Sequence, residues 1–100
     1  MTYLSKMTPR QNFKNLCNLT TDLVGLPKGS LSNRSREQKY QVPRAVISVI
    51  ARQEENIHRD IIGKGIDRDR TCVNHYEKFH KANYKSYERY RKTYIDVYIA

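Results

Sequence analysis

The sequence has few cysteines and no long apolar segment, and each shortage excludes a class of protein. Its two cysteines, Cys17 and Cys72, lie far apart without a second pair. That spacing is neither a metal-ligand set nor a disulfide framework, and it is typical of a reducing compartment. No apolar run approaches the roughly 18 residues that a membrane span requires, and the N-terminus lacks the apolar core of a signal peptide. We therefore expect a cytoplasmic protein without a membrane partner.

Motifs for catalysis are also missing. The chain has no Gly-x-x-x-x-Gly-Lys-Ser/Thr loop to hold nucleotide phosphates. Its histidines, His58, His75 and His80, show no Glu-x-x-His or cysteine spacing of a metal site. Cys72 lies three residues before His75, which allows a thiolate–imidazole pair on one helix, but no third catalytic group is implied. We expect no enzymatic activity, no metal and no cofactor.

Positive charge is what the chain has in excess. Its 100 residues carry 19 Lys and Arg against 10 Asp and Glu, a formal net charge of +9. Such a surplus indicates a polyanionic partner, either nucleic acid or an anionic membrane surface. The length predicts a single domain, 1–100, with a modest core.

Apolar spacing predicts that the chain is helical. Residues 1–7 are expected to be frayed. Thr8, Pro9 and Gln11 form a helix-capping signature, and Gly25 can end this first helix in the left-handed conformation. The predicted inward stripe between them is Phe13, Leu16, Cys17, Thr20, Leu23 and Val24.

The stretch 32–41 is polar and basic, has no periodicity and is expected to be an exposed loop. It is either a solvated linker or an arm that lays Arg34 or Arg36 in a minor groove, where narrow A·T tracts attract arginine.

Pro43 is expected to start the next helix at its first position. This helix is the most apolar element and should be the central one. Arg44 and Arg52 lie near its two ends. They are ordinary surface residues or, if the partner is nucleic acid, contacts to phosphate.

Two shorter helices are expected next, joined by a tight turn. Residues 57–64 form the first, in which Gly63 would allow close helix approach, and Gly65 makes the turn. Asp67 or Asp69 would cap the second helix. A pair of this kind after a long central helix is a helix-turn-helix layout. The predicted inward positions of the second helix are Val73, Tyr76, Phe79 and His80.

The beginning of that second helix carries side chains suited to DNA. A recognition helix presents its N-terminal residues to base edges. Arg68 and Arg70 can pair with phosphate or guanine. Asp69 can accept a hydrogen bond from cytosine or cap the helix, and Thr71 offers a hydroxyl and a methyl group. The plain alternative is a capped surface helix that happens to be basic.

The tail 84–100 is predicted to be an amphipathic helix with a tyrosine stripe. The stripe packs on its own domain, or it forms a homodimer or protein-partner surface. Stacking on single-stranded bases is less favoured because no groove is evident. The stripe consists of Tyr84, Tyr87, Tyr90, Tyr94 and Tyr98, with Ile95 and Ile99 beside it.

From Asn12 to Asn83 the order of these features resembles the C-terminal DNA-binding domain of DnaA, the bacterial replication initiator. The matching parts are Val24-Gly25, the basic loop 31–36, Pro43-Arg44, Ala51-Arg52, Ile62-Gly63, the segment 68–73 and His75. The last segment, Arg-Asp-Arg-Thr-Cys-Val, is similar to the family signature Gly-Arg-Asp-His-Thr-Thr-Val. The resemblance implies an all-α, Trp-repressor-like helix-turn-helix bundle over 8–83, to which 84–100 adds a tyrosine-rich helix.

The resemblance also implies roles for individual residues. One arginine of the basic loop would enter the minor groove, arginines of the long helix would contact DNA, and the start of the recognition helix would meet bases. The DNA-binding residues implied are Arg34, Arg36, Arg44, Arg52, Arg68, Asp69, Arg70, Thr71 and Cys72.

Several positions depart from the family pattern. Arg70 replaces a histidine and can make a bidentate contact to guanine, whereas Cys72 replaces a threonine and loses its hydroxyl donor. The ATPase domain of DnaA is absent from this sequence. We therefore expect sequence-specific binding of double-stranded DNA by a small regulator of replication initiation or transcription, cellular or from a phage or mobile element. The alternatives are a protein-interaction module that assembles through its tyrosine helix, and a nonspecific architectural DNA-binding protein.

Overall fold

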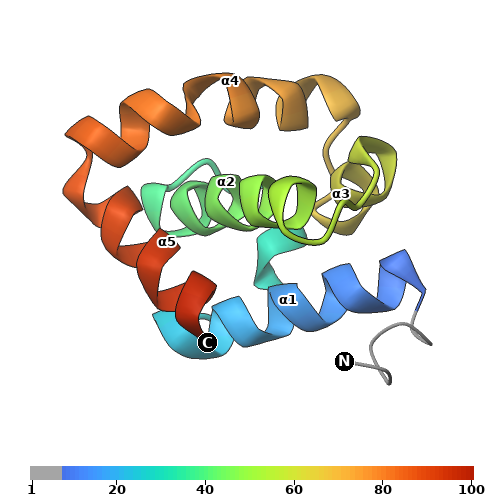
Figure 1. The fold of residues 1–100 in the computed structure, drawn as a ribbon. Helices are drawn as coiled ribbons and strands as arrows, with labels where there is room; N and C mark the ends of the chain where they lie inside the picture. Colours follow the sequence, from blue (N-terminus) through green and yellow to red (C-terminus); the bar gives the residue numbers. More distant parts are fainter. Residues whose placement is uncertain (1–7) are drawn as a thin grey trace.

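The computed structural model describes residues 8–100, which form five α-helices, one 3-10 helix and no strand (Figure 1). The prediction that residues 1–7 are frayed lies outside the described part. The helices are α1 (Pro9–Val24), α2 (Gln38–Gln53), α3 (Arg59–Gly65), α4 (Arg70–Ser86) and α5 (Glu88–Ile99), and the 3-10 helix is η2 (Ser30–Ser32). The predicted all-α class is confirmed. Within 8–100, no helix combines the length and apolar character that crossing a membrane requires.

The caps of α1 are those expected from the sequence. Thr8 accepts a hydrogen bond from the Gln11 backbone, Gln11 bonds back to the Thr8 backbone, and Pro9 occupies the first turn. Gly25 ends the helix at φ 75°. The predicted set of inward residues is partly wrong, because Leu23 is 46% exposed, whereas Thr21, which was not in that set, is buried. The Thr21 hydroxyl donates to the Asn18 carbonyl, so this polar residue is buried with its hydrogen bond made.

Helix α2 begins five residues earlier than predicted, at Gln38, so that Pro43 lies inside it. The amides of Tyr40 and Gln41 both donate to the Glu37 carbonyl, which closes the first turn before the proline. Pro43 has no N–H and leaves one carbonyl of that turn without its usual partner. Burial of Val42 and its successors stabilises the helix nevertheless, because residues 42–51 are all buried.

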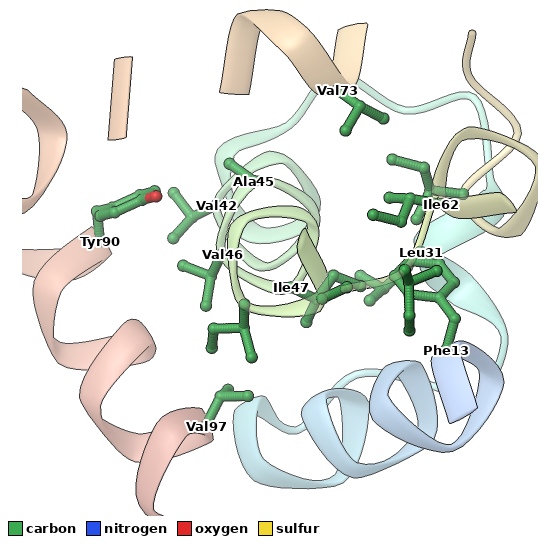
Figure 2. Packing of buried hydrophobic residues seen from close by; sticks show 14 residues of the cluster. Phe13, Leu31, Val42, Ala45, Val46, Ile47, Ile62, Val73, Tyr90 and Val97 are labelled. Carbon is green, nitrogen blue, oxygen red and sulfur yellow. The ribbon is translucent and has the colours of Figure 1, made fainter. Parts of the chain in front are cut away.

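All the other helices surround α2, as expected for the most apolar element. Figure 2 shows labelled side chains of α2 with core residues of the other four helices and of η2 arranged around them. Asn56, at φ 51°, reverses the chain after α2 and allows α3 to fold back. The shared core brings together Phe13 of α1, Leu31 of η2, Val46 and Ile47 of α2, Ile62 of α3, Val73 of α4 and Tyr90 and Val97 of α5.

The tight connection from α3 to α4 is present, but its geometry differs from the prediction. The residue with a positive φ is Asp67, at 55°, whereas Gly65 is the last residue of α3. A side chain at Gly65 would meet the ring of Phe13, so this glycine permits close contact with α1. Asp69 is the N-cap of α4, where its carboxylate accepts from the Cys72 amide at 3.0 Å. Phe79 was expected inside but is 42% exposed.

Gly63 is expected to tolerate no side chain. A Cβ atom there would lie 2.6 Å from the Arg68 carbonyl oxygen and 3.2 Å from the Asp69 carbonyl carbon. Both are backbone atoms of the turn and cannot rotate away. We expect Gly63→Ala to lower the free energy of unfolding by about 1–3 kcal/mol in urea denaturation. An ordinary helical Gly→Ala change raises that free energy by roughly 0.5–1 kcal/mol, so an increase would contradict the predicted clash.

The tail is not one helix starting at residue 84. Helix α4 continues to Ser86, Tyr87 takes an extended conformation at φ −116° and ψ 100°, and α5 then begins at Glu88. The bend turns α5 away from α4, so that α5 packs across α2 and reaches α1 (Figure 1). The five tyrosines therefore belong to two helices and the corner between them, and Tyr84 faces Tyr94 edge-on with ring centres 5.5 Å apart.

Much of the tyrosine stripe is used inside the domain. Tyr90 is 1% exposed, and its hydroxyl lies 2.7 Å from Nδ1 of His80. Burial lowers the pKa of His80 and raises that of Tyr90, so both groups are neutral near pH 7. Tyr98 is 52% exposed, and its neighbours Ile95 and Ile99 are 41% and 76% exposed. Of the predicted stripe, the C-terminal end of α5 is therefore the part exposed to a partner.

Candidate nucleic-acid interface

The loop between η2 and α2 is shaped by a buried arginine. Arg44 is 1% exposed, although the sequence suggested a surface position. Its Nε donates to the Leu31 carbonyl at 2.6 Å and its Nη1 to the Ser35 carbonyl at 2.7 Å. Its Nη2 donates to both the carbonyl and the side-chain oxygen of Asn33, at 2.8 and 2.7 Å. The buried guanidinium therefore holds the basic loop in place by hydrogen bonds. In this conformation it is not accessible for a direct contact with DNA.

Arg68 ties the same loop to the turn before α4. Its Nη2 donates to the Asn33 carbonyl at 3.2 Å, and its Nη1 donates to the Asp67 carbonyl at 2.9 Å. Burial and the nearby charge of Arg68 both lower the pKa of Arg44. Two arginines thus share one carbonyl, and segments 35 residues apart in the chain are held side by side.

Sequence reasoning missed Asn33, the residue on which both arginines converge. The amide of Ser35 donates to its side-chain oxygen at 2.9 Å, which is an Asx turn. An Asn two residues before a Ser in a loop was the available signal. It indicates a local turn and carries no information on which arginines would bind it.

The side chains exposed on this edge are among those predicted to contact DNA. Arg34 and Arg36 are exposed on the loop, and Arg70 and Thr71 are exposed in the first turn of α4. Within residues 8–100, neither loop arginine forms an ion pair. The fixed Asn33 backbone therefore brings two free cations of the loop next to the N-terminus of α4.

Arg70 has one acidic neighbour. Its Nε lies 3.8 Å from a carboxylate oxygen of Asp60 on α3, and both side chains are more than half exposed. Exposed pairs of this kind contribute little to stability, so Arg70 can exchange Asp60 for another acceptor at small cost.

Two other predicted contact residues have intramolecular roles. Cys72 is half-buried, and the Tyr76 hydroxyl is hydrogen-bonded with it. Arg52 is 24% exposed and pairs with Glu77 at 3.4 Å, while Arg59 holds the other Glu77 oxygen at 2.7 Å. The prediction of Arg52 as a phosphate contact overlooked Glu77, which lies 25 positions away in sequence.

The edge offers hydrogen-bond donors and cations. Within residues 8–100, no group of three or more His, Cys, Asp or Glu side chains is arranged to hold a metal ion. Exposed arginines around a helix N-terminus suit a phosphate backbone and base edges.

Comparison with known proteins adds no relative to this picture. No family model matches the chain, and no curated protein or solved structure shows significant similarity to it.

Proposed function

We propose that this protein binds double-stranded DNA with sequence preference, using α4 as a recognition helix and the loop 33–36 as an arm. The observation that carries the proposal is the convergence of Arg44 and Arg68 on Asn33, which presents the loop beside the start of α4. A helix entering the major groove and an arm lying in the adjacent minor groove need such a fixed relation. The formal charge of +9 supplies the attraction for the phosphate backbone.

Within this proposal, some residues contact DNA and others hold the loop in position. Arg70 and Thr71 face bases, because both are exposed in the first turn of α4. Arg34 and Arg36 contact the minor groove or its phosphates. Arg44 and Arg68, predicted as contacts, act instead by positioning the loop. The resemblance to the DnaA DNA-binding domain points to replication initiation or initiator-controlled transcription as the setting, in the cytoplasm.

The preferred site can be found by selecting bound sequences from a random duplex pool. We expect Arg70→Ala to weaken binding to that site by roughly 1–3 kcal/mol, measured by fluorescence anisotropy, and to relax preference at one position. Arg36→Ala should weaken all sequences alike if the loop holds only phosphate.

Lys81→Ala provides the matched control. Lys81 is exposed on the same helix, and its replacement by alanine removes one positive charge, as Arg70→Ala does. Lys81 lies 11 positions after Arg70, which is about 16 Å along the helix axis. We expect it to change affinity little. Equal losses for both variants, together with no enriched sequence, would favour a nonspecific architectural binder. Absence of duplex binding at low salt would exclude the proposal.

Assembly into a homodimer remains a second proposal, now confined to the end of α5. Tyr98, Ile95 and Ile99 are 52, 41 and 76% exposed, whereas Tyr90 is buried. Light scattering of the full chain and of Ile99→Glu tests this surface. A dimer that becomes a monomer would support it, and a monomeric full chain would exclude it.

A further inference from the structure

A second feature of the molecule lies between α1, η2 and α3. A cavity of about 460 Å³ opens there, within the range typical of small-molecule sites. Its walls are mainly apolar, with Phe13, Leu31, Cys17 and Ile61 contributing from three different elements. Phe13 and Leu31 are each 1% exposed and make a rigid floor.

The charged residues that line this cavity are all cationic. Arg10, Lys14 and Lys64 line it, and no acidic residue does. All three residues are exposed. Within residues 8–100, none of them forms a salt bridge with a carboxylate. Arg10 and Lys14 repel each other at a spacing of four on one helix. Arg10 also lies in the first turn of α1, which contains no acidic residue and where a cation opposes the helix dipole.

The interior adds no charge of its own. Burial raises the pKa of the Cys17 thiol to about 12, so it stays protonated and behaves as a small apolar group. Thr21 is buried with its hydroxyl already donated to the Asn18 carbonyl. The cavity therefore pairs an uncharged, mainly apolar interior with three uncompensated cations at its mouth.

We propose that this cavity binds a small organic anion, an aromatic or aliphatic body carrying one carboxylate, sulfonate or phosphate group. The body would replace water against Phe13 and Leu31, and the anionic group would lie among Arg10, Lys14 and Lys64. The cavity adjoins the proposed arm, because Ser32 lines it directly before the loop 33–36. Binding of the small anion does not depend on DNA binding. The cations of the cavity act on a ligand that enters it, which a DNA duplex cannot do.

The test compares two dyes of similar shape and different charge, 8-anilinonaphthalene-1-sulfonate and the uncharged N-phenyl-1-naphthylamine. Fluorescence titration of the full chain should give one saturable site for the sulfonate and markedly weaker binding of the neutral dye. Lys14→Gln and Lys64→Gln should each weaken the sulfonate by roughly five- to tenfold and leave the neutral dye unchanged. Lys81→Gln, which removes an exposed lysine of α4, is the control and should have no effect on either dye.

A second, independent experiment fills the cavity with a larger side chain. Cys17→Phe should abolish binding of both dyes, and circular dichroism would report whether the helices are retained. If the helices are lost, the two lysine variants alone test the proposal. Equal affinity of the wild type for both dyes would overturn the role of charge. If Lys14→Gln and Lys64→Gln left the affinity for the sulfonate unchanged, the dye would not bind at this cavity and the proposal would be wrong. Loss of DNA affinity in these variants with unchanged dye binding would assign the rim to phosphates and likewise overturn the proposal.

Discussion

Replacement of Arg44 by methionine is expected to lower the free energy of unfolding by about 2–5 kcal/mol. Methionine fills much of the same space but donates no hydrogen bond. The carbonyls of Leu31, Asn33 and Ser35 would lose the guanidinium that now binds all three. Urea denaturation followed by circular dichroism measures the change. The same variant should bind DNA more weakly than its residual stability explains, because the loop loses its fixed position beside α4.

Two further variants separate this role from simple loss of charge. Arg36→Met removes a cation from an exposed residue of the same loop, and we expect its stability to stay within about 0.5 kcal/mol of wild type. Arg44→Lys keeps the charge but not the planar fork, and it should recover only part of the loss. Wild-type stability of Arg44→Met would show that the loop is held by other contacts.

Tyr90→Ala is expected to have an effect of similar size, about 3–5 kcal/mol on the free energy of unfolding. The ring is 1% exposed against α2 and α4, and its hydroxyl bonds His80. Removing it opens a cavity and leaves the imidazole unpaired. Small domains are stable by only about 5–15 kcal/mol, so this variant should lose a large part of its stability and unfold at a clearly lower temperature than the wild type.

Tyr98→Ala is the comparison, since the two tyrosines lie on one helix and differ in burial. Tyr98 is 52% exposed, and its loss should cost under about 1 kcal/mol. Truncation after Asn83 should prevent folding, because it removes Tyr90 and Val97 from the core. If Tyr90→Ala left the monomer stable and only dissociated a dimer, the stripe would be an intermolecular surface.

Local signals in the sequence predicted local structure well. The capping box at Thr8, the left-handed Gly25 and the Asp69 cap depend on residues within four positions of one another. Such interactions are set by backbone geometry and are little changed by the rest of the fold.

Signals that compete with packing were misleading. Pro43 favours a helix start, yet α2 begins five residues before it. The amides of Tyr40 and Gln41 close a first turn on the Glu37 carbonyl, and Val42 is buried. Tyrosines spaced three and four apart favoured one helix over 84–100, yet a single extended residue, Tyr87, divides them so that α5 can cover α2. In the tail, apolar burial over several residues outweighs one local preference.

The sequence by itself determined the helical class, the positive charge and the composition of the α4 N-terminus, because these follow from residue type and short-range spacing. Only the tertiary structure decided which arginines are free. Arg44, Arg52 and Arg68 find acceptors 13, 25 and 35 positions away, and no periodicity encodes such partners. The candidate site is thus composed of two loop arginines that folding left without a carbonyl or a close acidic partner, Arg34 and Arg36, and of Arg70, whose single neighbour Asp60 is exposed.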